Sequence, residues 1–199
     1  KYLFFKKELQ VIESLSLEQL RQLLDIINDL YNCHVIHRDI CPQNLMLDYD
    51  TNHIKLIDFG CAITYDIDDK AGSIETRGTT IYAGLQILDV LAGISCDLTV
   101  GACYAYERTF DLQCSLNIII SMNNIDIKEK IYSFEILTDT HKTQLKILQF
   151  WKDTQRENQP YFYWASYQSH KGDQFKKYIS TKDSTIAILS NSHKADCDD

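Results

Sequence analysis

The chain has 199 residues, of which 45% are hydrophobic and 24% are charged, and its formal net charge is −8. This composition is typical of a soluble globular protein, and the acidic balance excludes a nucleic-acid binder that works through a broad basic surface. No apolar run approaches the roughly 20 residues that a membrane-spanning helix needs. Because Lys6, Lys7 and Glu8 interrupt residues 1–12, the sequence predicts no signal peptide.

The seven cysteines are odd in number, and no pair of them has the Cys-x-x-Cys spacing. Zinc sites and disulfide frameworks both use cysteines in regular sets, so neither class of protein fits this pattern. The sequence therefore predicts reduced thiols and a cytoplasmic or nuclear location.

The first elements are a short strand at residues 1–5 and a helix at residues 14–34. Ser16 can cap the helix, with Gln19 three residues later completing a capping box. Apolar residues recur at helical spacing and predict one buried face, which consists of Leu17, Leu20, Leu24, Ile27 and Tyr31.

Residues 45–59 are expected to form two short strands joined by a turn at residues 48–52. In the second strand Ile54 and Leu56 flank Lys55, which is the alternation of a half-buried strand. Residues 61–80 are polar and acidic, and their length predicts a functional or mobile loop.

Further helices are expected at residues 85–93, 110–122, 141–158 and 173–179. The segment at 110–122 is apolar enough for a buried helix, and Leu145, Leu148 and Trp151 share one face of the next. We expect one domain at residues 1–180 and a polar, disordered tail at 181–199.

The stretch at residues 35–48 contains the groups that phosphoryl transfer from a nucleotide requires. Asp39 and Asn44 are five residues apart, and Asp58 follows an expected strand. A carboxylate can orient and deprotonate an acceptor hydroxyl, and carboxylate and amide oxygens are the ligands that magnesium prefers.

The run "HRDICPQN" followed by "IDFG" resembles the H-R-D-x-x-x-x-N and D-F-G loops of the protein kinases. The resemblance implies an α+β protein kinase-like fold, ATP and Mg²⁺ as cofactors, and a protein substrate. It makes Asp39 the catalytic base, assigns Asn44 and Asp58 to magnesium, and places Met46 under the adenine ring. Phe59 and Gly60 complete the second loop.

Other residues receive supporting roles from the same resemblance. His37 is interpreted as structural, and Arg38 is expected to pair with a phosphate or carboxylate on the long loop. The segment "GTTIYAGLQIL" resembles the family's G-T-x-x-Y-x-A-P-E, which makes Thr79 the contact of the catalytic aspartate in serine/threonine-type members. Ser73 and Thr76 are candidate hydroxyls for regulatory phosphorylation, or ordinary loop residues.

The family's buried support helix begins with an aspartate, and two residues fit. Asp97 has the usual distance from the preceding segment, whereas Asp111 opens a more apolar stretch. We favour Asp111, which implies an insertion near residues 88–108.

The sequence also departs from the family pattern. Cys41 stands where serine/threonine kinases carry a lysine, and Gln43 stands where tyrosine kinases carry an arginine. Because a cation beside the transferred phosphoryl group stabilises the transition state, a slow enzyme is expected. Gly84-Leu85-Gln86 replaces A-P-E, whose glutamate normally pairs with a buried arginine, so weaker packing is expected there.

The glycine-rich loop, the strand lysine and the helix glutamate of a kinase are absent, so the resemblance covers only the hinge and the larger, mainly helical C-terminal lobe. We therefore expect an incomplete serine/threonine-type protein kinase domain that is inactive alone, without nucleic-acid or membrane partners. One alternative is a catalytically weak or dead kinase homologue acting as a protein-binding module. Another is a small-molecule kinase of the aminoglycoside or choline type, which the "GTTIY" segment disfavours.

Overall fold

The computed structural model describes residues 8–65, 74–75, 77–93, 103–104, 106–135 and 140–157. These residues form helices α1 (Leu17–Asn32), α2 (Leu85–Gly93), α3 (Phe110–Asn123), α4 (Ile125–Glu135) and α5 (Thr140–Glu157). They also form strands β1 (Gln10–Val11), β2 (Val35–Ile36), β3 (Leu45–Asp48), β4 (His53–Leu56), β5 (Ile63–Thr64), β6 (Ile74–Glu75) and β7 (Cys103–Tyr104). The mostly helical content with small sheets agrees with the α+β class expected from the sequence.

Several sequence predictions fall outside the described residues. These are the strand at residues 1–5, the helix at 173–179, the tail at 181–199, and the roles considered for Ser73, Thr76 and Asp97.

Helix α1 begins with the capping box that the sequence predicted. The Ser16 side chain accepts a hydrogen bond from the Gln19 N–H (3.3 Å), and the Gln19 side chain accepts one from the Ser16 N–H (2.9 Å). Leu20, Leu24 and the other predicted apolar residues are buried, but Leu17 is 48% exposed. As the first residue of the helix, Leu17 lies beyond the edge of the core, and Leu23 is buried in addition.

Strands β1, β3 and β4 form an antiparallel sheet in the order β1-β3-β4, and the predicted hairpin is its β3–β4 pair. The register pairs Leu45 with Leu56 at the end of the hairpin that leads into the candidate site. The sheet is joined to helix α1 because the side chain of Gln22 accepts a hydrogen bond from the Ile54 N–H (2.8 Å).

The loop expected at residues 61–80 contains regular structure near both ends. Strand β5 pairs antiparallel with β2, and β6 pairs antiparallel with β7. A turn of 3₁₀ helix at Thr80–Tyr82 then leads to helix α2. The prediction of one continuous loop was therefore wrong at these strands, which are two residues long and too short to show alternation.

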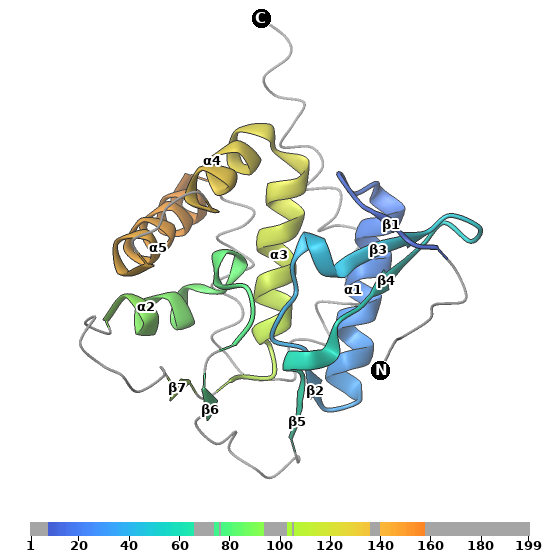
Figure 1. Ribbon diagram of the computed structural model, residues 1–199, viewed down its shortest axis with the longest axis horizontal. Coiled ribbons are helices and arrows are strands. Elements are labelled where there is room, and N and C mark those ends of the chain that lie inside the picture. Colours follow the sequence, from blue (N-terminus) through green and yellow to red (C-terminus); the bar gives the residue numbers. More distant parts are fainter. Residues whose placement is uncertain are drawn as a thin grey trace, which may run out of the picture.

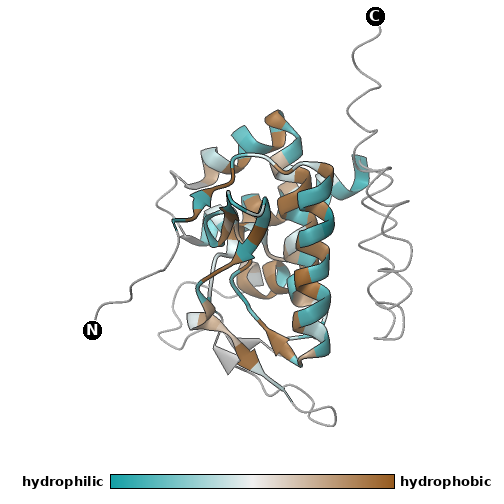
Figure 2. Ribbon diagram, turned by 90° about the vertical axis from the view of Figure 1, so that its right-hand side faces the viewer, coloured by the Kyte–Doolittle hydropathy of each residue, from teal (hydrophilic) through white to brown (hydrophobic). Residues whose placement is uncertain are grey.

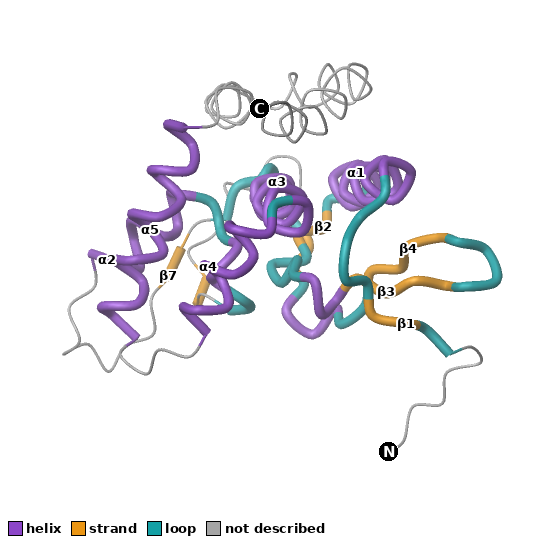
Figure 3. The backbone as a smooth tube through the Cα atoms, turned by 90° about the horizontal axis from the view of Figure 1, so that it is seen from above, coloured by secondary structure: helices purple, strands orange, loops and turns teal. Residues whose placement is uncertain are grey.

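Helix α3 lies in the middle of the molecule, with α1 on one side and α2 and α5 on the other (Figures 1 and 3). It is the buried helix that the apolar run predicted. Its buried apolar residues are Phe110, Leu112, Cys114, Leu116, Ile118, Ile119, Ile120 and Met122. In Figure 2 the surrounding helices carry both apolar (brown) and polar (teal) residues, as expected where one side of each helix covers a core.

Helices α4 and α5 differ from the sequence analysis in two respects. Helix α4 was not predicted at all, because its pattern is short and rich in charge. On α5, Leu148 and Trp151 are buried as expected, but Leu145 is 44% exposed. Helix α5 packs along α2, and its buried apolar face does not extend to Leu145.

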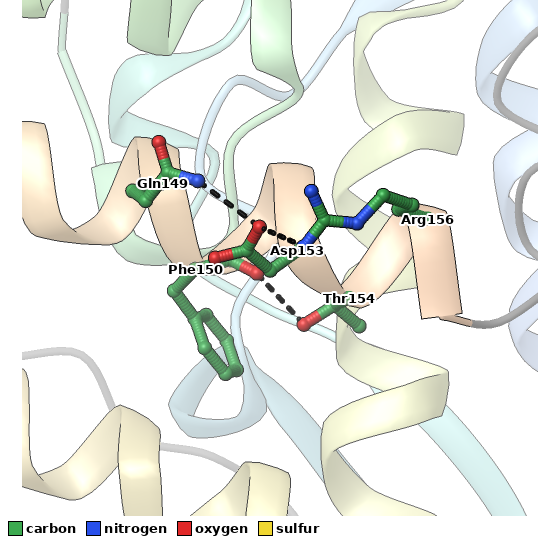
Figure 4. Close-up of polar contacts among 5 residues, drawn as sticks. All are labelled: Gln149, Phe150, Asp153, Thr154 and Arg156. Atoms are coloured by element: carbon green, nitrogen blue, oxygen red, sulfur yellow. Dashed lines mark hydrogen bonds and ion pairs between the residues drawn. The ribbon is translucent and has the colours of Figure 1, made fainter.

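Helix α5 carries polar contacts on both its exposed and its buried side (Figure 4). Asp153 accepts hydrogen bonds from the amide of Gln149 (3.0 Å) and the guanidinium of Arg156 (2.9 Å), and the hydroxyl of the buried Thr154 donates to the Phe150 carbonyl of the same helix (2.9 Å). Within the described ranges, none of the helices has the length and apolar character that crossing a membrane requires.

Candidate active site

The His37-Arg38-Asp39 loop follows strand β2, and one buried carboxylate from helix α3 fixes its backbone. Asp111 accepts hydrogen bonds from the backbone N–H groups of His37 (2.6 Å) and Arg38 (3.0 Å). Asp111 is 3% exposed, and this burial raises the pKa of its carboxyl to about 6, against the opposing effects of the two N–H donors and the Arg38 charge. Of the two aspartates considered for this position, the structure places Asp111 under the loop.

His37 is fully buried and connects the loop to the residues around Asp58. Its Nδ1 accepts a hydrogen bond from the Asp39 N–H (3.3 Å), and its Nε2 lies 3.0 Å from the Ile57 carbonyl oxygen. Nε2 must therefore carry the proton and donate, which is the neutral tautomer, and burial lowers the pKa of His37 in agreement. The ring also packs edge-on against Phe59, with centroids 4.6 Å apart. These are the contacts of a structural histidine.

Arg38 is buried, and it contacts the start of the long loop and the ring of Tyr106. Its φ is 67°, and its Nε donates to the Cys61 carbonyl (2.5 Å). Its guanidinium lies 5.2 Å from the centroid of the Tyr106 ring, whose hydroxyl accepts from the Arg77 N–H (3.3 Å). The expected phosphate or carboxylate partner belongs to the loop at residues 61–80, of which residues 66–73 and 76 lie outside the described residues.

The Asp39 carboxylate is oriented from two directions. Its Oδ1 accepts a hydrogen bond from the Thr79 N–H (2.7 Å), and its Oδ2 accepts one from the Asn44 amide (3.1 Å). The same amide group donates to the Asp39 carbonyl (2.8 Å). The structure therefore brings together Asp39, Asn44 and Thr79, and the Thr79 contact runs through its backbone N–H.

Gly78 allows the Thr79 segment to approach the loop this closely. Its φ is +88°, and a Cβ built on it would lie 2.2 Å from the Arg38 carbonyl oxygen. Any side chain at this position would clash with the Arg38 backbone, and the positive φ would be unfavourable for a residue other than glycine.

Asp58 lies next to Asn44 because of the hairpin register. One residue beyond the Leu45–Leu56 pair, the Ile57 N–H donates to the Asn44 carbonyl (3.0 Å), and Asp58 follows directly. Asp58 adopts the left-handed conformation (φ 59°, ψ 69°), and its Oδ1 accepts from the Gly60 N–H (3.2 Å). The carboxylate is exposed at the surface of the site.

The donor atoms of Asn44 and Asp58 fit a magnesium ion. Among the described residues, Oδ1 of Asn44 and Oδ2 of Asp58 accept no hydrogen bond, which leaves two hard oxygens available. The described residues contain no cluster of three or more histidine, cysteine or acidic side chains that could bind a metal. Magnesium suits such a pair, because it keeps several waters and takes substrate phosphates with one or two protein oxygens.

Cys41 and Gln43 stand where related kinases carry a cation, and the structure describes both. Cys41 is 3% exposed, and burial, followed by the nearby Asp39 charge, raises the pKa of its thiol. The thiol is therefore neutral and unsuited to act as a nucleophile. Gln43 is exposed, and Met46 is half-buried in strand β3, where it pairs with Val11. Val11 is 66% exposed on the same small sheet.

Sequence reasoning missed the hydrogen bonds that two buried side chains donate to the segment after Thr79. The Asn117 amide donates to the carbonyls of Tyr82 (3.0 Å) and Ala83 (3.1 Å), and the Trp151 indole donates to the carbonyl of Ile81 (2.7 Å). The one signal available in the sequence was an asparagine within an apolar helix, which indicates a buried polar group in need of a partner.

Comparison with known proteins agrees with this arrangement. The family model of the protein kinase domain matches residues 4–110. The probable dual specificity protein kinase YAK1 homolog of Encephalitozoon cuniculi (strain GB-M1) is 35% identical over 89 residues, which cover 44% of this chain and 21% of that protein. The human hormonally up-regulated neu tumor-associated kinase is 37% identical over 87 residues, covering 43% and 12%.

A third relative is the serine/threonine-protein kinase Genghis Khan of Drosophila melanogaster. It is 30% identical over 115 residues, which cover 54% of this chain and 7% of the relative. The matched regions thus span no more than 21% of the length of these three curated relatives. Because the family model matches more than half of the chain, and the H-R-D, Asn and D-F-G elements lie together in the structure, the chain belongs to the protein kinase domain family.

Proposed function

We propose that this chain forms the phosphoryl-transfer part of a protein kinase that uses ATP and Mg²⁺ to phosphorylate serine or threonine hydroxyls of a protein substrate. The observation that supports it is the Asp39 carboxylate, which receives one hydrogen bond from the Thr79 N–H and one from the Asn44 amide. This arrangement orients a base beside a surface segment that a peptide can approach.

Asp39 retains the capacity to act on a substrate. An ionised carboxylate has about four lone-pair sites, and the two hydrogen bonds described use two of them. In the proposed reaction the substrate hydroxyl oxygen attacks the γ-phosphorus and its proton passes to Asp39. The bond between the γ-phosphorus and the bridging oxygen breaks, and ADP leaves with that electron pair.

Asn44 and Asp58 are the proposed magnesium ligands, and Met46 is the proposed contact of the adenine ring. Magnesium, when bound, neutralises charge on the phosphate oxygens. Ser73 and Thr76 remain proposed sites of regulatory phosphorylation. The serine/threonine preference rests on Thr79, and two of the three relatives described have names that point to serine/threonine or dual specificity.

The 199 residues contain no G-x-G-x-x-G run, so this sequence supplies no glycine-rich loop for the phosphates. Since positioning accounts for most of the catalysis of phosphoryl transfer, we propose that these residues alone do not phosphorylate a substrate.

A second candidate function is a kinase homologue that binds a protein without efficient catalysis. Cys41 and Gln43 favour it, because no cation stands at either position to stabilise the transferring phosphoryl group. The intact set of Asp39, Asn44 and Asp58 favours the enzyme.

The experiment joins the chain to the glycine-rich, lysine-bearing lobe of one of its curated relatives. Transfer of labelled γ-phosphate to a generic protein substrate is measured with ATP and magnesium, and Asp39→Asn in the same hybrid provides the blank. Magnesium-dependent nucleotide binding is measured separately by calorimetry, so that a misfolded hybrid is recognised.

Transfer above the Asp39→Asn blank supports the enzyme. A hybrid that binds the magnesium–nucleotide complex normally but transfers nothing above the blank would instead establish the binding module.

A further inference from the structure

Three consecutive carbonyl groups after the Thr79 segment accept hydrogen bonds from buried side chains. The carbonyl of Ile81 accepts from the Trp151 indole (2.7 Å), and those of Tyr82 and Ala83 accept from the Asn117 amide (3.0 and 3.1 Å). Trp151 is 0% exposed and Asn117 is 1% exposed. Since an unpaired buried carbonyl is costly, these donors strongly favour one position for residues 81–83.

The two donors come from different helices, which makes the restraint independent of local sequence. Asn117 lies on α3 and Trp151 on α5, and 34 to 70 residues separate the paired groups. Residues 81–83 therefore take their place from the arrangement of α3 and α5, and the turn at Thr80–Tyr82 adds the hydrogen bond from the Ala83 N–H to the Thr80 carbonyl (2.9 Å).

Helix α5 is itself attached to α2, the helix that follows residues 81–83. Lys152 forms an ion pair with Asp89 (2.8 Å), and a His141 ring nitrogen lies 3.0 Å from the Ala92 carbonyl. Figures 1 and 3 both show α2 and α5 side by side. The indole of Trp151 thus projects from a helix that is held in place along its length.

Next to Gly84, helix α3 presents a further close contact. A Cβ built on Gly84 would overlap the end of the Gln113 side chain, so a larger residue here would require Gln113 to move. Residues 81–84, which include the first position of the Gly84-Leu85-Gln86 replacement for A-P-E, therefore pack directly on α3. The sequence predicted weaker packing here, because the glutamate of A-P-E and its ion pair are absent. The structure has neutral hydrogen bonds and close contact with α3 at this place.

Residues 81–83 are directly connected to the base. Thr79 lies two residues before Ile81, and its N–H donates to Oδ1 of Asp39 (2.7 Å). A Cβ built on Gly78 would overlap the Arg38 carbonyl, so the backbone at position 78 lies close to the loop. A displacement of Ile81 therefore moves the donor that orients Asp39.

We propose that Asn117 and Trp151 are positioning residues of the phosphoryl-transfer site, which fix residues 81–83 and through Thr79 orient the carboxylate of Asp39. This inference rests on the proposed function for its catalytic meaning. Neither residue touches substrate or the reacting atoms.

The test compares backbone amide hydrogen exchange, measured by NMR on the full chain, in Trp151→Phe and Asn117→Leu. Both variants remove the hydrogen-bond donor and leave an apolar side chain in its place. Asn123→Leu is the matched control, because Asn123 also lies on α3 but donates to the Ile119 carbonyl of its own helix (2.8 Å). Urea unfolding of each variant reports the global stability.

The expected result is that exchange at the Thr79 and Ala83 amides becomes about tenfold faster in both donor variants, the factor that corresponds to about 1.4 kcal/mol. Amides of strands β3 and β4 should keep their rates relative to global unfolding, and Asn123→Leu should leave Thr79 unchanged. Unchanged exchange at Thr79, or acceleration that only follows global unfolding, would overturn the proposal.

A second readout uses the hybrid kinase described above. Here Trp151→Phe should lower kcat at least about fivefold, with the KM for ATP unchanged, because the base is misoriented while the nucleotide site is intact. An unchanged kcat, or a change confined to the KM for ATP, would overturn the positioning role. If the unmodified hybrid shows no transfer, the proposed function fails, whereas the exchange data still decide whether the two side chains orient the Thr79 segment.

Discussion

Replacement of Asp111 by asparagine tests the link between helix α3 and the His37-Arg38-Asp39 loop. The two oxygens of Asp111 each accept one backbone N–H, from His37 and Arg38. Asparagine keeps the shape but offers one acceptor and one donor group, so one N–H loses its partner. The site is 3% exposed, so water cannot replace the lost acceptor.

The expected loss follows from the unsatisfied group. A buried donor without a partner costs about 1–3 kcal/mol, so we expect Asp111→Asn to reduce the free energy of unfolding by about 2 kcal/mol at pH 7.5. Domains of this kind are stable by about 5–15 kcal/mol, which makes this loss large enough to measure.

The loss should also depend on pH, because burial raises the pKa of Asp111 from 3.8 to about 6 in the folded chain. Because the pKa is higher in the folded state, folding takes up a proton at pH values between the two pKa values. The stabilisation from this proton is complete below pH 3.8 and disappears as the pH rises through about 6. At pH 5 the wild-type chain gains on the order of 1 kcal/mol that asparagine cannot gain, so the variant should be destabilised by about 3 kcal/mol there.

The assay is urea unfolding at both pH values, with Asp126→Asn as the control. Asp126 lies exposed in the first turn of α4 and should change stability by less than about 1 kcal/mol at either pH. Equal destabilisation at the two pH values would refute the raised pKa. Wild-type stability at both would refute the structural role of the two hydrogen bonds.

Three further predictions concern the proposed chemistry. Asp58→Ala in the hybrid kinase should abolish magnesium-dependent nucleotide binding measured calorimetrically, because a metal ligand is removed; an unchanged affinity would contradict the assignment. Cys41→Lys should raise the transfer rate, since the Cys41 thiol lies beside Thr79 and Asp39 and an ammonium group there would add the absent cation; a variant no faster than its parent would show that Cys41 is no handicap. Residues 1–199 alone should transfer no more labelled phosphate than their Asp39→Asn variant, and clear transfer would mean that another part of this chain fixes the phosphates.

The elements that the sequence predicted well are those with strong local signals. Helix α1 has a capping box and a regular apolar face, and the β3–β4 hairpin has alternation and a turn with Asp50 and Asn52. Once the hairpin register is known, the neighbouring positions of Asn44 and Asp58 follow from backbone geometry alone. Local signals therefore account for α1 and for the β3–β4 hairpin, whereas the resemblance to the kinase loops identified the H-R-D, Asn and D-F-G residues.

The features that the sequence did not predict depend on partners far away in the chain. The contacts of Trp151 with Ile81 and of Asn117 with Tyr82 join residues that no periodicity relates. Helix α4 was missed because tertiary packing of Ile127, Ile131 and Phe134 stabilises a segment whose charged residues obscure the pattern. A two-residue strand such as β5 has no pattern of its own and depends on β2 for its pairing.

Helix α3 has a consequence for how this site tolerates change. Asp111 and Asn117 lie six positions apart on it, about 9 Å along the axis. Asp111 anchors one half of the site, the loop that begins at His37, and Asn117 anchors the other half, the segment at Tyr82. The spacing between the two halves is therefore set by the pitch of one continuous helix and not by the volume of the surrounding core. Substitutions that shift α3 as a rigid body carry both halves together and preserve their alignment. An inserted residue or a kink between positions 111 and 117 would separate them, so the length of this helical interval constrains the site.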